Sequence, residues 1–201
     1  MSKTYIYELG GKIYFNITNH CDNDCEFCLR NTSNGVGEHD LWLDYQPTVA
    51  ELLTTLKATD LSEYTEGVFC GYGEPTQHLD GLISMSEYLK ENYPNMPLRI
   101  NTNGLVNLSY GEDITPRLKG LIDSVSISLN ATNATDYQRV CRSIYGEKAF
   151  DGLLDFAKKA GEQGIKVVMT IVDMLSNEDV ARCREIAQSV GAMLRIRPYL
   201  D

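Results

Sequence analysis

Strand-like and helix-like segments alternate along almost the whole sequence, and this alternation limits the possible folds more than any other feature. Six segments are short, apolar and rich in β-branched residues, as is typical of strands. They are residues 12–18, 67–70, 98–101, 124–130, 166–173 and 193–199. Because strands joined by helices lie parallel in one sheet, the sequence predicts a six-unit α/β fold, too small for the usual eight-fold closed barrel.

The segments between these strands carry helix signals. Val49, Leu52 and Leu56, for example, recur at the spacing of one helical face. Ser176 with Asp179 resembles a capping box that opens the last helix. Further helices are predicted near residues 82–89, 115–122, 137–142 and 150–157.

Residues 124–130 show the clearest strand alternation in the chain. Val125, Ile127 and Leu129 point to one face, and the intervening serines and Asn130 point to the other. A fully buried parallel strand is apolar on both faces. The pattern therefore predicts a polar lumen on one side of the sheet, with an exposed edge strand as the alternative.

The composition is that of a soluble globular protein with a negative surface. The chain has 201 residues, which suits a single domain over 1–201, and a formal net charge of -10. Such a charge argues against an extended nucleic-acid surface, which requires a basic footprint. No apolar stretch has the length of a membrane span and no secretory signal opens the sequence, so we expect a cytoplasmic protein.

Cys21, Cys25 and Cys28 form a C-x3-C-x2-C triplet directly after the first predicted strand. A [4Fe-4S] cluster normally takes four cysteine thiolates, so three on one loop leave one iron open to an external ligand. A structural zinc ion would need a fourth ligand such as His20, His39 or His78. His20 adjoins Cys21, which makes joint ligation awkward, and the other two lack the usual paired spacing. Disulfides are rare in cytosolic proteins. The triplet therefore favours an iron–sulfur cluster over zinc.

The other cysteines, Cys70, Cys141 and Cys183, are well separated in sequence. They form no second local motif, and we expect them to be small buried hydrophobic residues that cluster assembly does not need.

Three further motifs follow predicted strands, at the sheet edge where parallel α/β proteins place their sites. Gly71-Tyr72-Gly73-Glu74-Pro75 comes after the second strand, and glycine there allows a ligand to approach the backbone. Asn101-Thr102-Asn103-Gly104 follows the third strand, where Asn-Gly is also a common turn signal. Ser128-Leu129-Asn130-Ala131 ends the fourth strand.

With the cysteine triplet, these motifs resemble those of the radical S-adenosylmethionine (SAM) superfamily, most closely the small TatD-linked radical SAM proteins. The resemblance implies a (β/α)6 partial TIM barrel. It also implies an enzyme that binds S-adenosyl-L-methionine at the open iron of a [4Fe-4S] cluster. The enzyme would cleave SAM reductively to a 5'-deoxyadenosyl radical, which abstracts hydrogen from an unidentified substrate.

The resemblance also assigns residues to parts of SAM. The glycine segment places Gly73 and Glu74 near the ammonium group, with Asn103 as a further contact. Ser128 and Asn130 are expected at the ribose hydroxyls. Either Arg139 or Arg142, three apart on one predicted helix, is expected to bind the carboxylate, for which the planar guanidinium is suited. The adenine pocket is expected to include Phe27, Val172 and Tyr199.

Arg195 and Arg197 share one face of the last predicted strand. In so acidic a chain, two inward arginines suggest capture of a carboxylate or a phosphate, and a buried ion pair is an equally plausible interpretation.

The expected partners are a low-potential electron donor such as flavodoxin or ferredoxin and an unidentified small-molecule or protein substrate, with no membrane partner. The alternative function is a non-catalytic binding protein that holds zinc or a cluster on the same scaffold.

Overall fold

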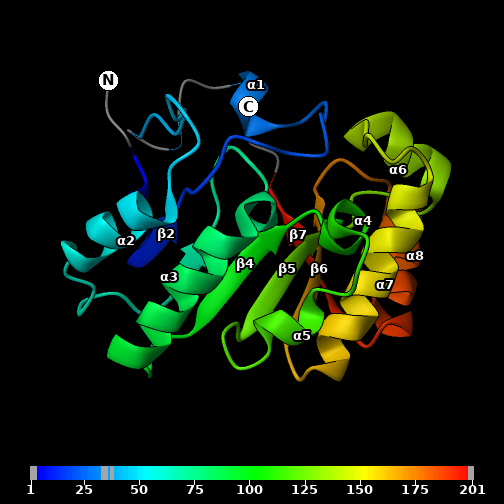
Figure 1. The fold of residues 1–201 in the computed structure, drawn as a ribbon. Coiled ribbons are helices and arrows are strands. Elements are labelled where there is room, and N and C mark those ends of the chain that lie inside the picture. Colours follow the sequence, from blue (N-terminus) through cyan, green and yellow to red (C-terminus); the bar gives the residue numbers. More distant parts are fainter. Residues whose placement is uncertain (1–3, 33–35, 37–38, 199–201) are drawn as a thin grey trace.

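A computed structural model describes residues 4–32, 36 and 39–198 of the chain. This part of the chain contains one seven-stranded sheet with its strands in sequence order (Figure 1). The strands are β1 Ile6–Leu9, β2 Lys12–Phe15, β3 Gly67–Phe69, β4 Leu98–Thr102, β5 Ser124–Ser128, β6 Lys166–Val172 and β7 Met193–Arg197. The helices are α1 Leu29–Thr32, α2 Val49–Lys57, the 3-10 helix η1 Pro75–His78, α3 Leu79–Asn92, α4 Val106–Tyr110, α5 Thr115–Leu118, α6 Ala134–Cys141, α7 Lys148–Glu162 and α8 Asn177–Ser189.

The six predicted strands correspond to β2 to β7, and each pairs in parallel with the next. Helices connect them in the predicted order, so the six-unit α/β architecture is confirmed. Within the described residues β1 and β7 do not pair with each other, and the sheet is an open, partial barrel.

Strand β1 is an addition that the sequence analysis missed. It pairs antiparallel with β2 through a tight hairpin at Gly10 and Gly11, whose φ angles are 60° and 71°. Two consecutive residues with positive φ are typical of the two-residue turn that joins twisted antiparallel strands, and glycine adopts them without strain. A Gly-Gly pair is therefore the signal that would have predicted this hairpin.

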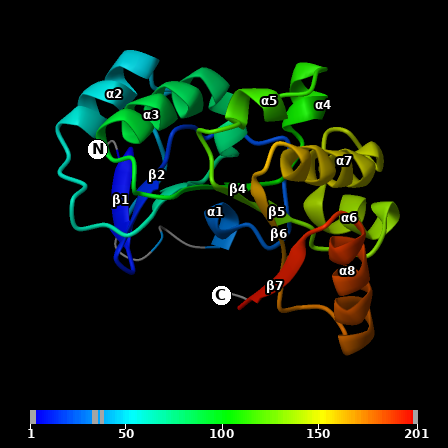
Figure 2. The same ribbon diagram turned by 90° about the horizontal axis from the view of Figure 1, so that it is seen from below.

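The hydrophobic core lies between the convex face of the sheet and the helices. Figure 2 shows α2 to α8 along this convex side and α1 on the concave side. Phe15, Phe69, Leu82 and Phe156 are fully buried there. Local signals set the helix starts. Thr48 and Glu51 form a reciprocal capping box at α2, and the Ser176 hydroxyl accepts the N–H of Asp179 at α8, as predicted.

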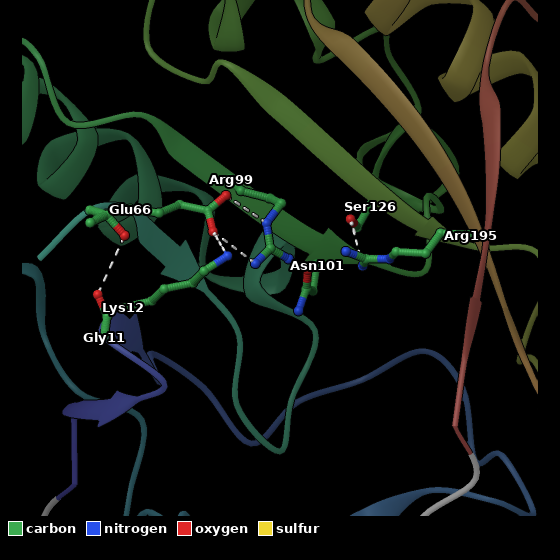
Figure 3. Close-up of polar contacts among 8 residues, drawn as sticks. Gly11, Lys12, Glu66, Arg99, Asn101, Ser126 and Arg195 are labelled. Atoms are coloured by element: carbon green, nitrogen blue, oxygen red, sulfur yellow. Dashed lines mark hydrogen bonds and ion pairs between the residues drawn. The ribbon is translucent and has the colours of Figure 1, made fainter.

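The concave face of the sheet is polar. Asn101 on β4 lies beside Ser126 on β5, and Thr170 on β6 lies beside Arg195 on β7. Because neighbours in a parallel pair point to the same face, this register gathers polar side chains on the side away from the helices. Figure 3 shows Arg99, Asn101, Ser126 and Arg195 there. The predicted polar lumen is thus confirmed for β5, whose Ser126 is only 4% exposed.

None of the helices in the described residues combines the length and the apolar composition that a membrane crossing requires.

Candidate cofactor site

The loop that carries the three cysteines is attached to the end of α6 by backbone hydrogen bonds. The N–H of Asp24 donates to the carbonyl of Cys141 at 3.0 Å, and the N–H of Glu26 donates to that of Val140 at 3.0 Å. These bonds join residues more than a hundred positions apart in the chain. They fix the middle of the loop, around Cys25, against the carboxyl end of the helix.

Side chains within the loop strengthen this attachment. Asn23 is buried and donates through Nδ2 to the hydroxyl of Tyr137 at 3.0 Å. The carboxylate of Asp22 accepts from Gln77 at 2.6 Å and from Ser109 at 2.7 Å. Burial raises the pKa of Asp22, and the bond from Ser109 opposes that rise. The sequence analysis missed these residues, because no local pattern indicates contacts of such long range.

The three cysteine side chains are partly exposed on this loop. Burial raises the pKa of Cys21 to about 12 and raises that of Cys28 as well. The thiol of Cys141 raises the pKa of Cys25 through a hydrogen bond, and burial adds to this effect. At neutral pH the free thiols are therefore protonated. A bound metal replaces these protons, because thiolate is the form that ligates.

The donor set fits a cluster better than a single zinc ion. Each iron of a cubane takes its own thiolate, so the three sulfurs need not meet at one point. A zinc ion gathers four ligands around itself. Among the described residues, no three His, Cys, Asp or Glu side chains converge on one ion position. His78 Nε2 instead lies 2.8 Å from the Pro47 carbonyl oxygen, and His39 packs on the ring of Tyr7.

The remaining cysteines differ from one another in position. Cys141 and Cys183 are fully buried, as predicted, and Cys70 is partly exposed. Cys183 donates weakly to the Ala131 carbonyl at 3.6 Å. Cys141 is distant from the triplet in sequence, yet its thiol contacts Cys25. Cys141 is therefore far from the triplet in sequence but next to it in the folded structure.

The Gly71–Pro75 segment packs directly on the cysteine loop. A Cβ atom added to Gly73 would lie 2.7 Å from the carbonyl oxygen of His20, and closer still to that of Thr18. The next residue, Glu74, donates its N–H to the same His20 carbonyl at 2.7 Å. Glycine is required here by this close approach, and the predicted motif and the cysteine loop form one continuous surface.

The carboxylate of Glu74 is buried and accepts bonds from the protein itself. Thr76 donates to it through its N–H and its hydroxyl at 3.2 and 2.8 Å, and the hydroxyl of Thr102 donates at 2.8 Å. The N–H of Asn103 donates at 2.6 Å. Burial raises the pKa of Glu74, and these bonds oppose the rise. Glu74 thus joins the glycine segment to the turn after β4, and its predicted contact with SAM stays a prediction.

A cavity of about 190 Å³ lies beside the cysteine loop. It gathers four residues that the sequence analysis assigned to SAM from four separate segments: Phe27, Asn130, Arg139 and Val172. Its other lining residues were missed: Glu26, Val140, Met174 and Leu175. Met174 and Leu175 lie two and three residues beyond the carboxyl end of β6, so the strand-end rule offered a signal for them.

Two of the predicted contacts carry polar atoms that have no partner in the described residues. They are Oδ1 of Asn130 and Nδ2 of Asn103, both buried. Asn130 also has a φ of 52°, in the left-handed region that asparagine tolerates better than most residues. A buried polar atom without a partner costs about 1–3 kcal/mol, so both atoms suit a polar ligand that supplies the missing bonds.

The structure separates the two candidate arginines. Arg139 lines the cavity and pairs with Asp136 at 3.1 Å. Arg142 is exposed, ends α6 with a φ of 47° and is not among the residues that line the cavity. Ser128 is half-buried at the end of β5, beside Thr170. Tyr199 lies outside the described residues.

The sequence model of the Radical SAM superfamily matches residues 15–190. The chain therefore belongs to the radical SAM superfamily of enzymes, as its motifs predict. No curated protein matches the chain. The further likeness to the TatD-linked proteins stays a prediction.

Solved radical SAM structures share the fold. SuiB of Streptococcus suis, bound to S-adenosylmethionine, is 17% identical with a TM-score of 0.67 over 94% of this chain. A radical SAM methyltransferase from Sphaerobacter thermophilus is 17% identical with a TM-score of 0.64 over 96%. The hydrogenase maturase HydG of Carboxydothermus hydrogenoformans is 17% identical with a TM-score of 0.58 over 94%. This chain covers only 40%, 57% and 44% of those proteins.

Proposed function

We propose that residues 1–201 form a single radical SAM domain in which Cys21, Cys25 and Cys28 hold a [4Fe-4S] cluster. When bound, the cluster and SAM supply the 5'-deoxyadenosyl radical that abstracts hydrogen from a substrate. The observation that carries the proposal is the cavity beside the cysteine loop. It brings together residues from four segments that the motifs had each assigned to SAM.

The residues of the chain bind and orient SAM in this proposal. Phe27 and Val172 provide the apolar surface for the adenine. Asn130 and Ser128 offer polar groups to the ribose at the end of β5, and the unpartnered Oδ1 of Asn130 supports this role. Arg139 binds the carboxylate, exchanging part of its exposed ion pair with Asp136 for a stronger bidentate contact.

The backbone around Gly73, with Glu74 and Asn103, receives the ammonium group. A low-potential donor such as flavodoxin or ferredoxin supplies the electron. Because the thiol ligands must stay reduced, we place the protein in the cytoplasm.

The central test is SAM cleavage by the anaerobically reconstituted and reduced protein. We expect slow release of 5'-deoxyadenosine without added substrate, measured by liquid chromatography and mass spectrometry. Protein loaded with cluster that never cleaves SAM under strong reduction would contradict the enzymatic function. Stoichiometric zinc in the native protein would favour the alternative, a zinc-holding binding protein.

The cavity lining supports Arg139 over Arg142 as the residue that binds the carboxylate. Arg139→Ala is expected to weaken SAM binding by about 1.5–3 kcal/mol, the range for a hydrogen bond to a charged group. Arg142→Ala, at the C-cap residue of the same helix, is the matched control and is expected to change binding by less than about 0.5 kcal/mol. Calorimetric SAM titration of both folded variants measures the difference. The reverse order of effects would assign the carboxylate to Arg142.

A further inference from the structure

Two arginines on the concave face of the sheet lack an acidic partner. Arg195 donates to the Ser126 hydroxyl at 3.2 Å, which is a neutral partner (Figure 3). Nε of Arg197 is buried and has no hydrogen-bond partner in the described part of the chain. No carboxylate among residues 4–32, 36 and 39–198 lies within ion-pair distance of either guanidinium.

Two neighbouring cations on the same face, in contrast, each have an acidic partner. Arg99 pairs with Glu66 at 3.0 Å and also contacts Asn101, and Lys12 pairs with the same Glu66 at 2.6 Å (Figure 3). Of Lys12, Arg99, Arg195 and Arg197, only the first two pair with a carboxylate in the described part of the chain, that of Glu66. Positive charge therefore exceeds negative charge around these residues, in a chain whose formal net charge is -10.

The surroundings of both arginines disfavour an isolated positive charge. Arg195 is an exposed residue, and the partial burial of its guanidinium lowers its pKa; the positive charge of Arg99 lowers it further, and Glu66 opposes the shift. Burial also lowers the pKa of Arg197, and the positive charge of Arg195 lowers it further. A bound anion would relieve the desolvation and the mutual repulsion together.

We infer that Arg195 and Arg197 form the recognition site for an oxyanion of the substrate, either a carboxylate or a phosphate. This inference rests on the proposed function, because it assigns a substrate class to the same enzyme. The two side chains stand two positions apart on one strand, so their Cα atoms are about 7 Å apart. That spacing suits a diphosphate, a dicarboxylate or a single oxyanion held between two planar guanidinium groups.

The inference is tested by binding, without any requirement for turnover. The cluster-loaded protein is titrated calorimetrically with inorganic pyrophosphate and separately with malonate, in the presence and absence of SAM. At least one probe is expected to bind saturably, and the preferred probe distinguishes a phosphate site from a carboxylate site. Arg195→Gln and Arg197→Gln are each expected to weaken this binding at least about tenfold, the lower limit for a charged hydrogen bond. Arg184→Gln, an exposed arginine on α8, is the matched control and should bind the probe unchanged.

Three outcomes would overturn the inference. The first is that neither probe binds saturably. The second is that the wild type and both glutamine variants bind the probe equally. The third is that Arg197→Gln loses SAM affinity but keeps probe binding. Iron content and SAM cleavage of the same preparation report separately on the proposed function. Normal cleavage without probe binding would remove only the anion site. If Arg197→Gln fails to fold, Arg195→Gln alone decides, since its side chain is exposed.

Discussion

Replacing Cys21, Cys25 and Cys28 together with alanine is expected to remove all iron from the anaerobically reconstituted protein. The wild type is expected to bind about four iron atoms per chain, the content of one cubane cluster. Iron and acid-labile sulfide analysis measures this content, and the visible absorbance and electron paramagnetic resonance signal should disappear with it. The loss should be complete, because the three ligands act as one set.

Two further variants make this result specific. Cys183→Ala removes a buried cysteine on α8 that bonds only weakly to Ala131, and it should retain the wild-type iron content. Cys141→Ala removes the thiol that contacts Cys25 and should also retain iron, because Cys141 is not proposed as a ligand. Loss of most iron in folded Cys141→Ala would show that the cluster has a fourth protein ligand.

Glu74→Gln is expected to lower the free energy of unfolding by about 1–3 kcal/mol and to weaken SAM binding as well. The carboxylate accepts two backbone N–H groups, from Thr76 and Asn103, through different oxygens. An amide nitrogen cannot accept, so one buried N–H loses its partner although the side chain keeps its shape. Urea unfolding of the apoprotein followed by circular dichroism measures the stability change, and calorimetry on the loaded protein measures SAM binding.

Glu91→Gln serves as the matched control, because Glu91 is an exposed glutamate on α3. Its change in stability should stay within about 0.5 kcal/mol, as for most surface substitutions. An equally small effect of Glu74→Gln would mean that the turn after β4 does not depend on this carboxylate.

The order and type of the main elements could be read from the sequence because they depend on local periodicity. Strands β2 to β7 and helices α2, α3, α7 and α8 each carry their own apolar repeat. Strand β1 and the five-residue helix α4 were missed, since both are too short for a repeat to stand out. Several strand ends were predicted one to three residues too far, because side-chain alternation continues after the ladder of backbone bonds ends.

The cysteine triplet and the strand-end motifs were also local features, and both could be recognised from their spacing in the sequence. Contacts between distant segments, by contrast, have no local pattern in the sequence that indicates them. Three such contacts depend on how the chain folds back on itself. They are the contact between Cys141 and Cys25, the bonds by which Glu74 joins two turns, and the ion pair of Arg99 with Glu66. For the last strand, the sequence left an ion pair and an anion site equally open. In the structure, the ion pair on this face is made by Arg99 of β4 with Glu66.

The attachment of the cysteine loop affects how a cluster would be acquired. The loop is held by α6 on one side and by the glycine segment on the other, entirely through bonds that the protein makes itself. Its ordering entropy is therefore lost during folding rather than during metal loading. In this respect the loop is unlike a zinc finger, whose metal-binding energy is its folding energy. A cluster held by these cysteines would therefore be inserted into a loop that is already folded in the apoprotein.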